Sequence, residues 1–104
     1  MSKREINLTS DTKQVLVKMG SNIRKARLRR NFNAEFIAEH ANISTDTLSS
    51  IEKGAPTVSI GAYAAVLAVL EIDKDLQVVA LDVEGKNQFW EQDLYQRVRA
   101  SKRK

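Results

Sequence analysis

The fold is decided by one stretch, FNAEFIAEHANISTDTLSSIE, which runs from residue 32 to residue 52. Asn33 stands before its first apolar repeat, where the side chain can cap a helix by accepting a hydrogen bond from a backbone N–H. Ile37, Ala38 and Ala41 then recur at steps of three and four residues, which is the spacing of one buried helix face. The stretch therefore begins with a short amphipathic helix.

A tight turn and a second short helix follow. Asn42 falls where the first helix should stop, and Asn tolerates the left-handed backbone that a sharp turn needs. Ser44 is the expected N-cap of the second helix, which should direct Leu48 and Ile51 inward. Two helices joined in this way are typical of a helix-turn-helix, whose second helix lies in the major groove of DNA. The side chains left facing outward are Thr45, Asp46, Ser49 and Ser50.

Length and composition limit the remaining possibilities. The 104 residues allow one small domain and a tail, and a core of that size would gain from homodimer formation. Cysteine is absent, so disulfides and thiolate metal sites are excluded. The N-terminus lacks an apolar signal segment, and the longest apolar tract, residues 58–70, is too short to cross a bilayer. We expect a cytoplasmic protein with no membrane segment.

Charge is distributed unevenly along the chain. Residues 1–30 carry nine Lys or Arg and two acidic residues, residues 31–85 carry two and nine, and residues 86–104 carry six and two. Basic ends that flank an acidic middle would attract a polyanion such as DNA. The alternative is that these charges only keep helix surfaces solvated.

Helices are also expected on both sides of the central stretch, which makes the fold all-α with five helices. The first should be capped by Ser10 or Asp11 and reach about Arg30, and Gly20 within it would let another helix approach closely. Its expected buried residues are Val15, Met19, Ile23 and Ala26, with Leu16 next to them.

After the central stretch, Gly54 suits a helix C-cap and Pro56 prevents the helix from continuing. A helix from about Ser59 is apolar on most sides, so part of it is expected to face a second subunit. Residues 75–81 fit a helix, although residues 78–83 also alternate like a strand that would pair across a dimer.

The C-terminal extension, residues 82–104, is expected to be partly helical with a basic end. Trp90, Leu94 and Val98 follow one another at four-residue steps. Trp90 is expected either to pack within the protein's own dimer or to dock into a partner. The residues proposed for dimer or partner contacts are Tyr63, Leu70, Leu76, Trp90 and Leu94.

Residues 20–70 resemble the Cro/C1-type helix-turn-helix family, also called the XRE family, which includes the lambdoid phage repressors. The family opens on Gly-x-x-Ile-Arg-x-x-Arg, matched here by Gly20, Ile23, Arg24 and Arg27. Its middle and closing motifs are matched by Phe32, Asn33, Ile37, Ala38, Ile43, Ser44, Thr47, Leu48, Ser49, Ile51, Glu52 and Gly54. Two departures are Ala34, where the family has a DNA-contacting Gln, and Asn42, where it has the turn Gly.

The polar residues 1–9 are expected to form a flexible arm before a DNA-binding domain of residues 10–81. The resemblance implies a dimeric protein that binds an operator in double-stranded DNA through that domain. It places Thr45, Asp46, Ser49 and Ser50 at the positions that read base edges, and it implies an ion pair between Arg27 and Glu52. None of the base-reading side chains is basic, so phosphate contacts should supply much of the affinity. The expected phosphate ligands are Arg29, Arg30, Asn33, Ser44 and Lys53.

Residues 54–60, 70–76 and 93–99 look more narrowly like the small regulators of HipB type. Those antitoxins bind operator DNA as dimers and hold a HipA-like kinase toxin, so the expected function is a transcriptional repressor that is also the antitoxin of such a pair. Two alternatives remain: a stand-alone phage-type repressor, and an interaction module that neutralises a toxin kinase with weak DNA specificity.

Enzymatic, metal and cofactor chemistry is not expected. His40 is the only histidine, so a histidine metal cluster or proton relay would lack partners. No Ser or Thr has an obvious paired base, and no phosphate-binding glycine loop occurs. A solvent-facing His40 near DNA is the expected arrangement.

Overall fold

The computed structural model describes residues 6–82 of the chain. These residues form four α-helices and one 3-10 helix and contain no strand, which confirms the expected all-α class. The helices are α1 (Ser10–Arg29), α2 (Ala34–Ala41), α3 (Thr45–Glu52), α4 (Ile60–Val69) and the 3-10 helix η1 (Asp73–Val78). The C-terminal extension beyond residue 82 lies outside the described residues.

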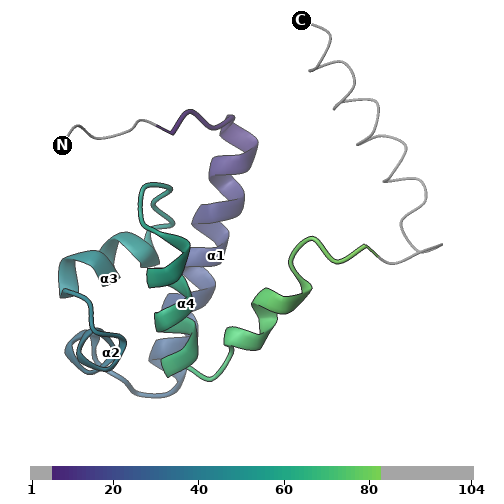
Figure 1. Cartoon of the computed structure of the whole chain (residues 1–104). Helices are drawn as coiled ribbons and strands as arrows, with labels where there is room; N and C mark the ends of the chain where they lie inside the picture. Colours follow the sequence, from purple (N-terminus) through teal and green to yellow (C-terminus); the bar gives the residue numbers. More distant parts are fainter. Residues whose placement is uncertain (1–5, 83–104) are drawn as a thin grey trace, which may run out of the picture.

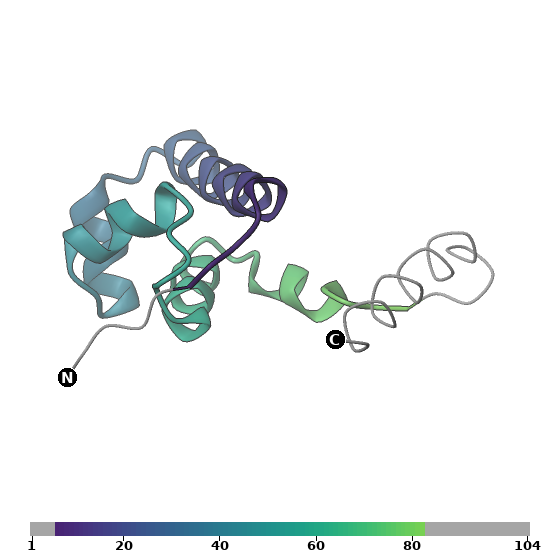
Figure 2. The same cartoon turned by 90° about the horizontal axis from the view of Figure 1, so that it is seen from above.

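The helices pack around one core. α1 packs against α3, α2 contacts both α3 and α4, and η1 packs against α4. Seen from above, α1 and α4 lie on opposite sides of the molecule, and the pair α2 and α3 closes one end (Figure 2). η1 leaves the end of α4 and leads away from α2 (Figure 1).

Hydroxyl and amide side chains cap the start of every α-helix. Asn33 and Ser44 cap α2 and α3 as the sequence predicts, and Ser59 caps α4; each accepts a hydrogen bond from the backbone N–H three residues later. The predicted cap of α1 is wrong, because Thr9 takes that place and Ser10 is already helical. Thr9 therefore belongs structurally to the domain and not to the N-terminal arm.

Each of the four α-helices is followed within two residues by one with left-handed backbone: Asn31, Asn42, Gly54 and Glu71. At Asn42 the backbone φ is 60°, and the N–H groups of Asn42 and Ile43 bond back to the carbonyls of Glu39 and Ala38. This is the Schellman arrangement, and it reverses the chain sharply. The sequence predicts it at Asn42 and Gly54, but Glu71 is a residue type that carries no such signal.

The core is formed by Ile23, Ile37, Ala41, Leu48, Ile51, Tyr63, Val66, Leu67 and Leu70. The predicted inward face of α1 is wrong at Val15, which is 64% exposed. Val15 lies eight residues before Ile23 and so about 80° around the helix, whereas Leu16 lies only about 20° from it. Leu16 therefore joins Met19 and Ile23 on the inner side.

Gly20 and Gly54 lie where α1 crosses the end of α3. A Cβ on Gly20 would lie 2.6 Å from both the Gly54 nitrogen and the Ile51 carbonyl oxygen, and a Cβ on Gly54 would overlap the Leu16 carbonyl. The expected close approach of a helix at Gly20 is confirmed. Contact between backbones fixes the position of α3 on α1.

The predicted helix at residues 75–81 differs in type and limits. η1 is a 3-10 helix that begins at Asp73 without a side-chain cap and ends at Val78, where Val79 turns to an extended backbone. Two consecutive β-branched residues do not favour a longer helix. Val78, where the alternative strand of residues 78–83 would begin, belongs to η1; the single chain has no strand at residues 79–82, and Val83 lies outside the described residues.

Candidate nucleic-acid interface

The outer side of α3 is a small polar surface. Leu48 and Ile51 are buried in the core, which leaves Thr45, Asp46 and Ser49 exposed and Ser50 half-exposed. All four predicted base-reading side chains therefore lie together on one short helix. The surface offers hydroxyl groups, a methyl group and one carboxylate.

The starts of α2 and α3 differ in what they can still donate. Ser44 Oγ accepts from Thr47 N and donates its only hydrogen to Thr47 Oγ1, 3.0 Å in each case, so its hydroxyl is fully engaged in capping. Asn33 Oδ1 accepts from Phe36 N at 2.8 Å, whereas the Asn33 NH₂ group makes no hydrogen bond within residues 6–82. Asn33 is thus the better phosphate donor of the two.

Each of these helix starts also carries an acid, Glu35 on α2 and Asp46 on α3. A carboxylate stabilises the positive end of a helix, but it also repels a phosphate approaching the same end. Phosphate contacts at these ends therefore depend on side-chain donors more than on the helix dipole.

The predicted basic ligands are unequally available. Arg29 and Lys53 are exposed, Lys53 directly after α3. Arg30 is half-buried, and its Nη1 donates to the Ala26 carbonyl oxygen at 2.9 Å, at the end of α1. The structure therefore leaves Arg29 and Lys53 for an anionic partner and engages Arg30 in closing its own helix.

Arg27 and Glu52, the pair expected to be ionic, are held face to face by α1 and the last turn of α3. Arg27 Nε lies 2.7 Å from Glu52 Oε2 and Nη2 lies 3.1 Å from Oε1, with 12% and 9% of the two side chains exposed. The third guanidinium nitrogen, Nη1, donates to the Phe32 carbonyl oxygen at 3.0 Å. The hydrogen bonds to Glu52 raise the pKa of Arg27 above its ordinary value.

Sequence reasoning missed the bond from Arg27 to the Phe32 carbonyl. A backbone acceptor in a loop leaves no residue-type signal, so only the folded chain reveals it. Its consequence is that one side chain joins α1, the loop before α2 and the end of α3.

Two of the predicted partner contacts lie in the core of the single chain. Leu70 is fully buried and Tyr63 is 6% exposed, because α4 turns both side chains toward the core. The Tyr63 hydroxyl donates to the Ala55 carbonyl oxygen at 2.7 Å, and burial raises the Tyr63 pKa. Leu76 is partly buried against the core, and Trp90 and Leu94 lie outside the described residues.

His40 is exposed at the end of α2, with its Nδ1 2.9 Å from the Phe36 carbonyl oxygen. Its ring lies 4.1 Å from that of Phe36, which in turn lies 4.6 Å from the ring of Phe32. In residues 6–82 no group of three His, Asp or Glu side chains is placed to hold a metal ion. None of the helices in that part of the chain is long and apolar enough to span a membrane.

Comparisons with protein-family models, curated proteins and solved structures found no match to this chain.

Proposed function

We propose that this protein is a sequence-specific, dimeric DNA-binding repressor that reads its operator through α3. The observation that carries the proposal is the division of α3 into two faces. Leu48 and Ile51 fix the helix on the core, while Thr45, Asp46 and Ser49 project from it without being needed for packing. An exposed helix held rigidly by its neighbours is what major-groove reading requires.

The chemistry of the α3 surface favours particular bases. Asp46 accepts a hydrogen bond from a cytosine amino group, the Thr45 methyl packs on a thymine methyl, and the serines serve either base. No arginine is present on this surface to make a bidentate contact with guanine. Each good contact contributes about 1 to 3 kcal/mol of discrimination.

Base contacts on α3 give selectivity, so much of the binding strength must come from contacts to phosphate. The described residues as a whole carry no net charge to attract it. Residues 6–82 contain nine basic and nine acidic residues. Arg29, Lys53 and the Asn33 amide contact phosphates in this proposal, and the terminal segments add positive charge. A dimer doubles these contacts on a twofold-symmetric site.

The HipB-type resemblance adds a kinase toxin as a second partner, so the proposed repressor is also an antitoxin. The segments of that resemblance include residues 93–99, which lie outside the described residues. This part of the proposal rests on the sequence alone. Its test is whether the full chain co-purifies with the product of an adjacent gene.

Selection from a pool of random DNA duplexes tests the DNA-reading function and requires no assumption about the operator sequence. The full chain is expected to enrich a motif with two symmetric half-sites about 10 base pairs, or one helical turn, apart. The interaction-module alternative predicts binding without enrichment of any sequence. Recovery of unselected sequences after repeated rounds would therefore reject the repressor.

A further inference from the structure

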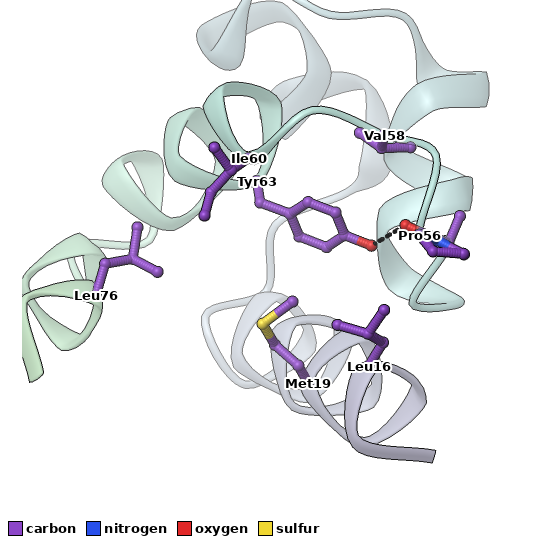
Figure 3. A pocket seen from close by; sticks show the side chains of 8 residues that line it. Leu16, Met19, Pro56, Val58, Ile60, Tyr63 and Leu76 are labelled. Atoms are coloured by element: carbon purple, nitrogen blue, oxygen red, sulfur yellow. Dashed lines mark hydrogen bonds between the residues drawn. The ribbon is translucent and has the colours of Figure 1, made fainter. Parts of the chain in front are cut away.

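An apolar pocket lies between α1, α4 and η1, on a part of the molecule that the proposed DNA contacts do not use. Its volume is about 170 Å³. Leu16 and Met19 line it from α1, Val58, Ile60 and Tyr63 line it from α4 and the residues before it, and Leu76 closes it from η1 (Figure 3).

The lining has no free polar side chain. Its one side-chain hydroxyl, that of Tyr63, already donates to the Ala55 carbonyl oxygen (Figure 3). A pocket of this kind holds water poorly, and an apolar cavity of about 150 Å³ is large enough for one benzene ring. The Met19 thioether adds a favourable contact for an aromatic edge. The pocket can therefore accept an aromatic ring.

Two further observations connect the pocket with the chain that follows it. Ile60, one of the lining residues, is 74% exposed, so the pocket is open to an incoming side chain. Leu76 also lines it, and the described chain continues from Leu76 for only six more residues, to Asp82; Val78, Val79 and Leu81 are exposed along that stretch.

We infer that this pocket receives Trp90 from the C-terminal segment of the same chain. Trp90 is the only tryptophan and is the first residue of the apolar series Trp90, Leu94 and Val98. Docking would cover Ile60 and place the largest apolar side chain of the protein against Leu16, Met19 and Leu76. This inference does not depend on the proposed DNA-binding function, because none of the proposed DNA contacts lines the pocket.

The length of the connection allows such docking. Six residues separate Leu76 from Asp82, so these two residues are at most about 20–22 Å apart, whereas the eight residues from Asp82 to Trp90 span up to about 26–29 Å. A short tether also gives an effective concentration of about millimolar. The same chain can therefore supply the tryptophan without a second copy.

Intrinsic fluorescence tests the inference on the full chain, because all tryptophan emission comes from Trp90. The native protein is expected to emit at shorter wavelength than in denaturant and to resist quenching by acrylamide. Ile60→Lys should shift the emission to longer wavelength and restore quenching. Val15→Lys is the matched control, because Val15 is similarly exposed on α1 but does not line the pocket. Circular dichroism establishes that both variants remain folded.

A mixing experiment identifies the source of the docked side chain. Trp90→Phe, which has an intact pocket but no tryptophan, is combined with Ile60→Lys, and the two are allowed to exchange subunits. Docking within one chain predicts that the emission stays at long wavelength. A return to short wavelength would overturn the inference in favour of docking into a second copy. Solvent-like emission from the unmodified protein would overturn docking altogether.

Discussion

The Arg27 side chain connects three segments of the described chain. Its three guanidinium bonds join α1 to Glu52 at the end of α3 and to the Phe32 carbonyl in the loop between α1 and α2. Both partners of the ion pair are nearly buried, so the loss of either would leave an uncompensated charge. The pair therefore fixes the position of α3 on α1.

Glu52→Ala is expected to lower the free energy of unfolding by about 3 kcal/mol, since it leaves Arg27 charged and nearly buried. Urea denaturation followed by circular dichroism measures this change. Arg24→Ala is the control: Arg24 lies 4.0 Å from the same carboxylate but is 59% exposed, and its loss should cost less than about 1 kcal/mol. Equal losses in the two variants would contradict the role given to Arg27.

Tyr63→Phe removes both the hydrogen bond and the ionisable hydroxyl of Tyr63, and the pH of the measurement distinguishes their effects on stability. At neutral pH it should cost about 0.5 to 1.5 kcal/mol, because the bond to the Ala55 carbonyl is removed. Burial raises the Tyr63 pKa, so the folded state holds this proton more tightly than the unfolded state. The protonated Tyr63 hydroxyl therefore contributes its full stabilisation below about pH 10. That contribution is lost as the pH rises through the pKa of Tyr63 in the folded state.

Denaturation curves measured from pH 8 upward check this sign. The unmodified protein should lose stability more steeply above about pH 10 than Tyr63→Phe does. The raised Arg27 pKa has no part in this, because that group stays charged throughout the range. Parallel losses in the two proteins would show that Tyr63 is not the group responsible.

At the level of elements, α1 and α3 are held together by backbone contact at Gly20. Gly20→Ala is expected to destabilise the fold by about 1 to 3 kcal/mol, since the new methyl group would meet backbone atoms of residues 51–54 that have little room to move. Thermal and urea denaturation measure the effect.

Gly61→Ala is the matched control for this substitution. It makes the same change in an exposed part of α4, where the nearest atom to the new Cβ is Ser59 Oγ at 3.7 Å. It should stabilise the protein by about 0.5 to 1 kcal/mol, because Ala favours the helix over Gly. Similar effects of the two substitutions would show that helix propensity, and not the close contact between α1 and the end of α3, determines the stability change at Gly20.

Helix ends were predictable from the sequence where a residue type typical of a cap or a tight turn stands at the end. Asn33, Asn42, Ser44 and Gly54 each have the side chain, or the absence of one, that their backbone position requires. Thr9 was missed because Thr, Ser and Asp follow one another there and all three cap helices well. The burial of Tyr63 and Leu70 could not be foreseen either, since an all-apolar helix gives no periodicity to show which face turns inward.

In the candidate site, the sequence predicted which side chains of α3 face outward, but not which of the nearby arginines are engaged in hydrogen bonds. The outward position of Thr45, Asp46 and Ser49 follows from the inward spacing of Leu48 and Ile51. The engagement of Arg30 with the Ala26 carbonyl and of Arg27 with Phe32 depends on backbone acceptors, which no sequence pattern indicates.

For the whole molecule, the net charge of +4 lies entirely in the terminal segments. Residues 6–82 are balanced, whereas residues 1–5 and 83–104 carry the excess of Lys and Arg. The proposed function therefore assigns recognition and attraction to different parts of the chain: α3 would select the sequence, and the ends would supply long-range attraction to phosphate.

Replacing Lys102, Arg103 and Lys104 by Gln tests this division. The triple variant should bind all duplexes more weakly by a similar factor, with unchanged preference among them. The slope of the logarithm of the binding constant against that of salt concentration should fall by about one for each phosphate that the variant no longer neutralises. Fluorescence anisotropy at several salt concentrations measures both quantities. A change in base preference would contradict the separation.

The central claim, that α3 reads DNA, is tested most directly by replacing Thr45, Asp46 and Ser49 together by Ala and titrating the variant with the selected duplex. Gln14, Asp73 and Gln77 replaced by Ala form the control, because these residues are exposed outside α3 and the charge changes equally. The α3 variant should keep its melting temperature and lose about 100-fold or more in affinity, down to its affinity for random DNA, while the control is unchanged. Undiminished affinity of a folded α3 variant for the selected duplex would contradict the claim.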